Sequence, residues 1–118
     1  IVSVVKRALF FQPSTIQTEE NTFNYMSGQT IFQENDPADS VYFIMKGKVE
    51  EKHNDRVLLR EKGSFIGERS CIITKYRVYT AVALTDVELI KFSQEQYVAF
   101  LSENPQATSK FVRKITNY

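Results

Sequence analysis

The sequence predicts a mainly β fold, an antiparallel sandwich or barrel with helices before and after it. Short segments rich in β-branched and aromatic residues, separated by turn residues, recur between residues 22 and 92. Behind them, apolar residues recur at the spacing of amphipathic helices. The chain has 118 residues, the size of one domain, which is enough to bury a core without disulfides or a structural metal.

Residues 1–21 are expected to be a helical or irregular segment that packs on the barrel. Residues 1–11 are apolar but are interrupted by Lys6 and Arg7, which is unfavourable for a signal-peptide core and favours an amphipathic helix. Residues 14–21 are polar and turn-like. Because the chain begins with isoleucine rather than methionine, we expect it to be a piece of a longer protein.

Residues 22–92 are expected to form the barrel. The segments with strand character are 23–25, 30–32, 41–45, 49–52, 57–59, 80–84 and 87–92. Turn-forming residues separate these segments, among them Gly28, Gly47 and the tripeptide 53–55, which suits a hairpin. Short strands at this regular spacing are typical of antiparallel sheets.

Residues 93–118 are expected to form two helices. Ser93 is a favourable N-cap, and Gln96 three residues later completes a capping box. The first helix should end at Asn104, because the residue before a proline disfavours helical backbone. The apolar positions of the second helix recur every four residues: Ala107, Phe111 and Ile115. We expect this stripe to pack against the barrel.

Composition excludes several classes of function. The chain has 15 Lys and Arg against 14 Asp and Glu, so it lacks the electrostatic footprint for duplex DNA or an anionic membrane. The single cysteine, Cys71, cannot form an internal disulfide and fits a cytoplasmic protein, and no run of 18 apolar residues suits membrane insertion. His53 is the sole histidine, so a metal centre is not expected. No nucleophile–base pair is visible either, and the chain is not expected to be an enzyme.

The segment 67–77 interrupts the strand pattern and contains the candidate site. Gly67 precedes residues 68–73, which are expected to form two helical turns whose free N–H groups and dipole suit a phosphate. Arg77 would hold the same phosphate with charged hydrogen bonds worth roughly 1.5–3 kcal/mol. Glu68 is an acceptor and suits a neighbouring sugar hydroxyl. On spacing alone, the alternative that Glu68 and Arg77 form a structural ion pair is favoured.

A set of residues matches one family's pattern in register across roughly residues 23–105. These residues are 28–32, 35–36, 41–44, 47–49, 63–65, Phe65-Ile66-Gly67-Glu68, Arg77, Thr80, Ala83 and 85–87. In these features the sequence resembles the cyclic nucleotide-binding domains of bacterial catabolite activators and of the regulatory subunits of cyclic-AMP-dependent protein kinase. The match is tightest at residues 65–68, and the spacing from there to Arg77 has no gap.

The resemblance implies an eight-stranded antiparallel β-roll, a jelly-roll-like barrel, with a phosphate-binding cassette at residues 65–79. It implies that Arg77 holds the cyclic phosphate, that Glu68 holds the ribose 2′-hydroxyl, and that the N–H groups of Ser70 and Val78 also contact phosphate. The candidate ligand-binding residues are Phe65, Ile66, Gly67, Glu68, Arg69, Ser70, Arg77, Val78 and Tyr79. The expected ligand is cyclic AMP (cAMP), with cyclic GMP (cGMP) as the alternative, because cGMP-preferring relatives often carry a hydroxyl where Val78 stands. No metal or other cofactor is expected.

Several positions depart from the family pattern. Arg69 stands where a small apolar residue is usual, and it either helps to hold the phosphate or pairs with the preceding glutamate. Tyr76 replaces a common proline. Tyr79 replaces a small residue and either narrows the binding cavity or points outward. Phe111 and Tyr118 are candidates for capping the base, although both are better interpreted as core or end residues.

The expected function is that of a regulatory domain. Binding of a cyclic nucleotide would rearrange the flanking helices and be transmitted to a covalently linked output domain. The alternative is a domain of the same fold that does not bind nucleotide and acts as a protein-interaction or dimerisation module, with a second copy of the chain as partner. The basic residues of the last helix are interpreted as a solvated helix end, not a nucleic-acid contact: Lys110, Arg113 and Lys114.

Overall fold

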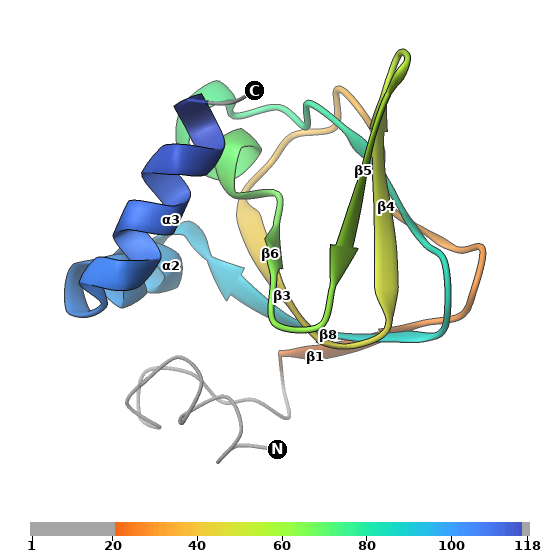
Figure 1. Ribbon diagram of the computed structural model, residues 1–118, viewed down its shortest axis with the longest axis horizontal. Coiled ribbons are helices and arrows are strands. Elements are labelled where there is room, and N and C mark those ends of the chain that lie inside the picture. Colours follow the sequence, from red (N-terminus) through yellow and green to blue (C-terminus); the bar gives the residue numbers. More distant parts are fainter. Residues whose placement is uncertain (1–20, 117–118) are drawn as a thin grey trace.

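A computed structural model describes residues 21–116 and shows two antiparallel four-stranded sheets facing each other, with two helices beside them (Figure 1). This confirms the prediction of a mainly β fold built as an eight-stranded roll. The helix expected near the start of the chain lies outside the described residues, as does Tyr118. Within residues 21–116, no helix has the length and apolar character needed to cross a membrane.

The eight strands are divided equally between the two sheets. One sheet has the order β1 (Thr22–Tyr25), β8 (Val87–Ser93), β3 (Ser40–Lys46) and β6 (Phe65–Ile66). The other has the order β2 (Thr30–Phe32), β7 (Thr80–Ala83), β4 (Lys48–His53) and β5 (Arg56–Glu61). The hairpin turn expected between β4 and β5 is present. β6 is absent from the sequence prediction, because a strand of two residues is too short to display a period.

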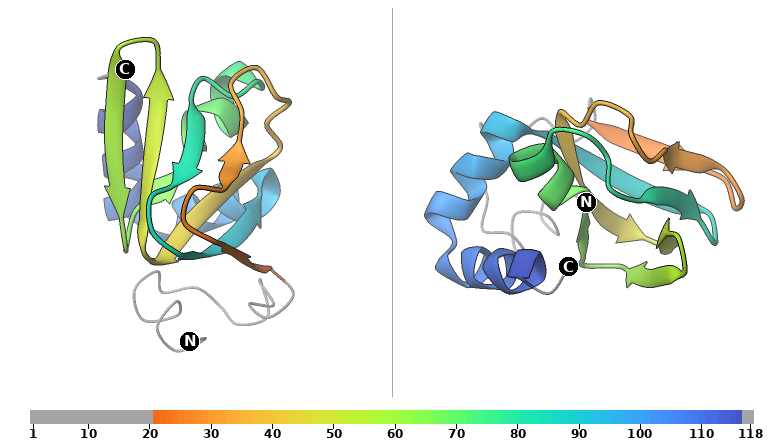
Figure 2. Two further views of the ribbon diagram at one scale, coloured as in Figure 1. Left: turned by 90° about the vertical axis from the view of Figure 1, so that its right-hand side faces the viewer. Right: turned by 90° about the horizontal axis from the view of Figure 1, so that it is seen from above.

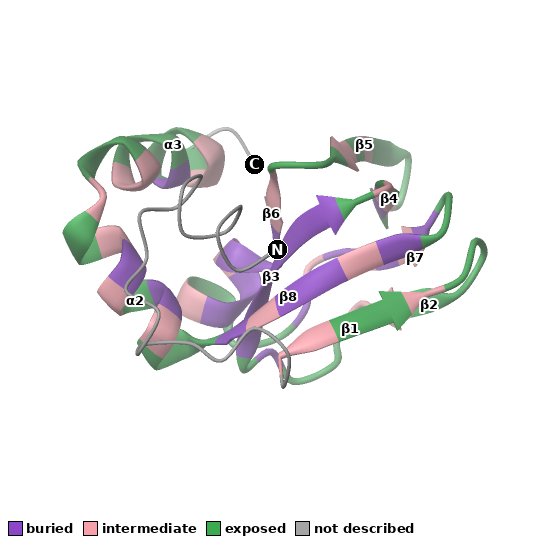
Figure 3. Cartoon of the chain, turned by 90° about the horizontal axis from the view of Figure 1, so that it is seen from below, coloured by how far each residue is buried: buried purple, intermediate pink, exposed green. Residues whose placement is uncertain are grey.

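Strand β3 separates two apolar cores. Every residue of β3 except Lys46 is buried, and Figure 3 shows the strand as a buried band beside β8. Successive side chains of a strand point to opposite faces. Val41 and Phe43 accordingly face the helices, whereas Tyr42 and Ile44 face the other sheet.

Helices α2 (Gln94–Glu103) and α3 (Pro105–Thr116) lie together at one side of the roll (Figure 2). The expected capping box begins α2: Ser93 Oγ accepts from the N–H of Gln96 at 3.1 Å, and Gln96 Oε1 accepts from the N–H of Ser93 at 2.8 Å. The expected packing of the apolar stripes is confirmed as well. The buried aromatic residues in this core are Phe43, Phe92, Tyr97, Phe100 and Phe111.

The segment between β6 and β7 is helical, as predicted, but it is not a regular α-helix. Residues 70–74 form the π-helical turn η1 (Ser70–Thr74), in which the N–H of Lys75 donates to the carbonyl of Ser70 at 2.7 Å. Lys75 then adopts a φ of 68°, which reverses the chain toward β7. Wide turns of this type occur often at functional sites.

Candidate functional site

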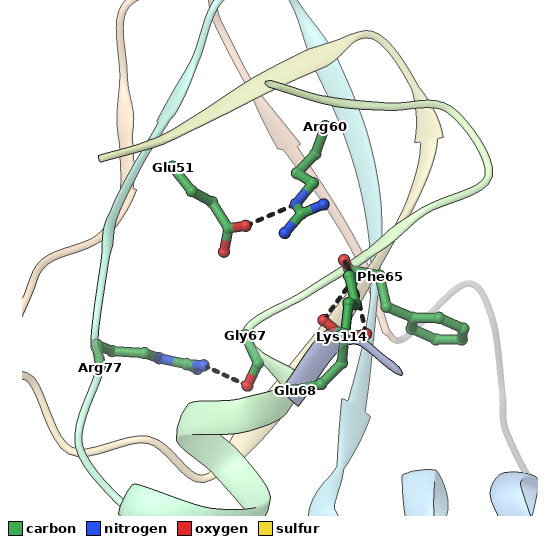
Figure 4. A network of polar contacts seen from close by, with 7 residues as sticks. All are labelled: Glu51, Arg60, Phe65, Gly67, Glu68, Arg77 and Lys114. Carbon is green, nitrogen blue, oxygen red and sulfur yellow. Dashed lines mark hydrogen bonds and ion pairs between the residues drawn. The ribbon is translucent and has the colours of Figure 1, made fainter. Parts of the chain in front are cut away.

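Arg77 directs its side chain into the roll from the segment just before β7 (Figure 4). The residue is only 4% exposed. Its Nη1 donates to the carbonyl of Gly67 at 3.3 Å, and its Nη2 donates to Ser40 Oγ at 3.1 Å. Both acceptors are neutral, so neither balances the charge of the guanidinium.

Within residues 21–116 no carboxylate lies at ion-pair distance from Arg77, although Asp39 and Glu51 act on its charge from farther away. Its Nε is buried and has no hydrogen-bond partner. The ring of Phe32 lies 4.1 Å from the guanidinium carbon and supplies a cation–π contact. Burial lowers the pKa of Arg77, as expected for a cation that has lost water. An anion placed at this guanidinium would compensate that loss.

The close approach of the Arg77 side chain requires a glycine at position 67. The glycine has a φ of 82°, which side chains rarely adopt. A Cβ at this position would also overlap Arg77 Nη1. The Gly67–Arg77 pair that the sequence singled out is therefore one structural unit, in which the backbone accepts the guanidinium at close range.

Glu68 is buried and forms an ion pair with Lys114 from the last turn of α3 (Figure 4). Lys114 Nζ donates to both carboxylate oxygens, at 2.9 and 2.8 Å, and to the carbonyl of Phe65 at 2.8 Å. These three acceptors match the three protons of an ammonium group. Burial raises the pKa of Glu68, and Lys114 offsets part of that increase. A Glu68–Arg77 ion pair is therefore the wrong alternative, and Lys114 is wrongly interpreted as part of a solvated helix end.

Arg69 makes a second connection to α3. Its Nη1 donates to the carbonyl of Ile115 at 2.9 Å. That carbonyl belongs to the last turn of the helix, where carbonyl groups lack partners inside the helix. The cassette therefore binds the end of α3 at two adjacent points. A contact of Arg69 with phosphate stays a prediction.

Ser70 and Val78, both expected near the phosphate, contact each other. The N–H of Val78 donates to Ser70 Oγ at 3.1 Å, and Ser70 is buried. The amide that the resemblance assigns to the phosphate thus has an internal acceptor. A phosphate oxygen would have to replace the Ser70 hydroxyl to accept this bond.

The remaining candidate residues are Tyr79 and Ile66, which are buried, and Phe65, which is half-buried. Tyr79 does not point outward: it is 4% exposed and contacts the ring of His53 edge to face at 6.2 Å. Phe65 and Ile66 lie in the two apolar cores, so their side chains position the cassette. Phe111 is a core residue, as interpreted from the sequence.

A second ion pair, between the buried Glu51 and the half-buried Arg60, was not predicted. Glu51 is 2% exposed, and its Oε1 accepts from Arg60 Nε at 2.9 Å. A glutamate at an inward position of a strand breaks the apolar alternation, and this was the available signal. The other contacts missed from the sequence are those of Phe32 and Ser40 with Arg77, and of Lys114 with Glu68.

A cavity of about 1190 Å³ opens between β5, the cassette and α3, which is large enough for a nucleotide. The basic residues that line it are Arg56, Arg60, Lys110, Arg113 and Lys114, whereas Glu68 is its acidic lining residue. Residues 21–116 contain no cluster of three or more metal-ligating side chains. Of the candidate ligand-binding residues, Phe65 and Glu68 line this cavity, whereas Arg77 does not. The basic lining suits an anionic ligand, and Glu68 suits a hydroxyl group.

Known proteins are similar to this chain in both sequence and fold. Residues 22–104 match the family described as the cyclic nucleotide-binding domain. A global nitrogen regulator of Nostoc sp. is 33% identical over 89% of this chain and 48% of its own length. A cAMP-dependent protein kinase regulatory subunit of Aspergillus niger is 27% identical over 77% of this chain and 23% of its own.

The catabolite activator protein of Thermus thermophilus gives a TM-score of 0.72, with 27% identity, over 98% of this chain and 53% of that structure. The chain thus spans about half or less of each of these proteins. The matched residues include both β-sheets, Gly67, Glu68 and Arg77. The chain belongs to the cyclic nucleotide-binding domain family.

Proposed function

We propose that the chain is a regulatory domain in which Arg77 binds the cyclic phosphate and Glu68 the ribose of a cyclic nucleotide, and in which α3 transmits binding to a neighbouring output domain. The observation that carries the proposal is the buried guanidinium of Arg77, which has neutral acceptors and an unpartnered Nε. A cyclic phosphate has one negative charge and two exocyclic oxygens. These suit the planar fork of a guanidinium, which binds two oxygens at once.

The ribose contact is the proposed link to α3. The 2′-hydroxyl donates a hydrogen bond to the Glu68 carboxylate, whose two oxygens already accept from Lys114. The hydroxyl and the ammonium group therefore compete for one carboxylate. Ligand binding weakens the Lys114 contact and favours a different position of α3, which is a population shift driven by differential contacts.

Calorimetry with cAMP and cGMP tests binding. The wild type should bind at least one of them, and Arg77→Ala should reduce that affinity by about 100-fold, because it removes charged hydrogen bonds worth about 1.5–3 kcal/mol each. Lys62→Ala is the control, since Lys62 is an exposed cation that does not line the cavity. Absence of binding at millimolar nucleotide would refute the proposal.

Hydrogen exchange of the α3 amides tests transmission. Saturating nucleotide should increase exchange in the last turn of α3, where Lys114 and Ile115 are held by the cassette. The variant Lys114→Met should show this increase without ligand. Binding that leaves the α3 amides unchanged would contradict the coupling while leaving the nucleotide site intact.

The second candidate function is a module of the same fold that binds a protein partner and no nucleotide. Two observations favour it: Lys114 already satisfies Glu68, and Ser70 already accepts from the Val78 amide. A rise in melting temperature with cyclic nucleotide separates the candidates, because only a nucleotide-binding domain is stabilised by that ligand. Under either proposal, incubation with cAMP or cGMP should give no hydrolysis product.

The identity of the nucleotide is a separate question. Val78 lacks the hydroxyl of cGMP-preferring relatives, which supports cAMP.

A further inference from the structure

The last turn of α3 lies beside the segment between β6 and β7 and is held by it (Figure 1). Lys114 Nζ donates to both carboxylate oxygens of Glu68. One residue further along the helix, the carbonyl of Ile115 accepts from Arg69 Nη1 at 2.9 Å. A covalent change in this single turn would therefore act on both contacts that position the end of α3.

Thr116 ends this turn, and its side chain is exposed. Its Oγ1 donates to the carbonyl of Arg113 at 3.0 Å. That carbonyl is one of the last four of the helix, which have no amide partner within the helix. The hydroxyl proton of Thr116 thus helps to cap α3, in a residue that is open to solvent.

Two basic residues precede Thr116 at the positions that arginine-directed protein kinases recognise. Arg113 lies three residues before the threonine and Lys114 two residues before it. Among the serine and threonine residues of the chain, only Thr116 has basic residues at both positions. Kinases of this type select their substrates by complementary charge. Arg113 is exposed, whereas Lys114 is half-buried in its ion pair with Glu68, so the second basic residue can be recognised only when that pair opens.

We propose that Thr116 accepts a phosphoryl group from an arginine-directed kinase, and that this phosphorylation releases the last turn of α3 from the cassette. The kinase transfers the γ-phosphoryl group of ATP. The bond from the γ-phosphorus to ADP breaks, a bond from the same phosphorus to Thr116 Oγ1 forms, and the hydroxyl proton leaves. The modification is an input to the movement of α3 that does not depend on the binding of a cyclic nucleotide.

Three consequences of the phosphate act in the same direction. Oγ1 becomes an ester oxygen and can no longer donate to the carbonyl of Arg113. The added charge of about −1.5 to −2 lies at the C-terminus of α3, where the helix dipole is already negative. The phosphate is also a stronger acceptor for Arg69 than the neighbouring carbonyl of Ile115. The last turn therefore loses its cap, and Lys114 is no longer held in place against Glu68.

Phosphorylation of the 118-residue chain by a purified arginine-directed serine/threonine kinase with ATP tests the acceptor. Mass spectrometry should locate the phosphate at Thr116, and Thr116→Val should take up none. Ser109→Ala is the matched control, because Ser109 is an exposed hydroxyl on the same helix without basic residues at the two preceding positions. Glu68→Gln should be phosphorylated about tenfold faster than the wild type, because a neutral amide holds Lys114 less tightly than a carboxylate does.

Hydrogen exchange without cyclic nucleotide tests the release. A chain carrying phosphothreonine at position 116 should exchange the last-turn amides of α3 about tenfold faster than the unmodified chain. Thr116→Val separates the phosphate from the loss of the hydroxyl, because it removes the same hydrogen bond and adds no charge. This variant should increase exchange by less than the phosphate does.

The outcomes separate this inference from the proposed function. Phosphate on Thr116, together with exchange faster than in Thr116→Val, supports the inference. Absence of phosphate from Thr116 in both the wild type and Glu68→Gln overturns it, and so does a phosphate that leaves exchange at the level of Thr116→Val. Because no arm of the test contains a cyclic nucleotide, a failure of cyclic nucleotide binding leaves this inference standing, and a failure here leaves the proposed binding standing.

Discussion

The two buried charges of the cassette, on Glu68 and Arg77, have different kinds of partner. Glu68 is buried with a cation from α3, whereas Arg77 is buried with a carbonyl and a hydroxyl and with an unpartnered Nε. A ligand therefore only adds a partner to Arg77, but it has to share or exchange the partner of Glu68. Under the proposed function, Arg77 therefore supplies affinity and Glu68 couples binding to α3.

The largest expected effect follows from replacing Arg77. Arg77→Met should reduce nucleotide affinity by about 100-fold, since charged hydrogen bonds are worth about 1.5–3 kcal/mol each. It should not lower the melting temperature, because it replaces a buried, uncompensated cation with an apolar chain of similar length. Calorimetry and thermal unfolding measure the two quantities. A clear loss of stability would show that Arg77 is compensated within the fold.

The matched change at the other end is Lys114→Met, and its expected effects have the opposite signs. It leaves the Glu68 carboxylate buried without its cation, which should lower the free energy of unfolding by about 1–3 kcal/mol. Nucleotide affinity should rise, because the ribose hydroxyl no longer competes with an ammonium group. Chemical denaturation measures the free energy of unfolding, and calorimetry measures the nucleotide affinity. A fall in affinity would make Lys114 part of the binding site.

Gly67→Ala tests the close approach of Arg77 to the cassette backbone. Strain from the positive φ should cost about 1–3 kcal/mol, and the new methyl group should displace Arg77 and weaken nucleotide binding. Gly28→Ala is the control, because Gly28 has a φ of 91° but no atom near its Cβ position. Equal effects of both substitutions on binding would contradict the assigned role.

The pH dependence of Glu68 gives the smallest expected effect. Because burial raises its pKa above the ordinary value of 4.5, the folded domain binds this proton more tightly than the unfolded chain does. Its contribution to stability should therefore increase as the pH falls from above the raised pKa toward 4.5. Thermal melts of the wild type and Glu68→Gln at pH 7 and pH 5 should show the wild type gaining relative to the variant. A constant difference would mean that the pKa is not raised.

Much of the fold could be predicted from local patterns. The alternation around β3, the turn residues between strands and the Ser93–Gln96 capping box are short-range signals, and each was confirmed. Two local features escaped prediction. β6 has two residues and η1 has five, so neither is long enough to leave a periodic trace.

The site was predictable only where its residues are close in sequence. Gly67, Glu68 and Arg77 lie within one segment, and the structure brings the first and last into contact. The partners of these residues come from distant positions: Lys114 is 46 residues from Glu68, and Ser40 is 37 residues from Arg77. Sequence patterns describe neighbours along the chain, so contacts made by the winding of the roll were not available to them.

Helix α3 has the geometry of a lever. It is a rod of 12 residues, about 18 Å long at the usual rise per residue. In the proposed coupling, α3 rotates about Asn104, next to α2, and the cassette holds the opposite end at Lys114 and Ile115. A rotation of about 10° at the pivot would move the far end by about 3 Å, which is comparable to the length of a hydrogen bond. In that coupling the cassette holds the end of α3 that moves farthest. Loss of the Glu68–Lys114 ion pair alone leaves the hydrogen bond from Arg69 to the carbonyl of Ile115 holding the same end.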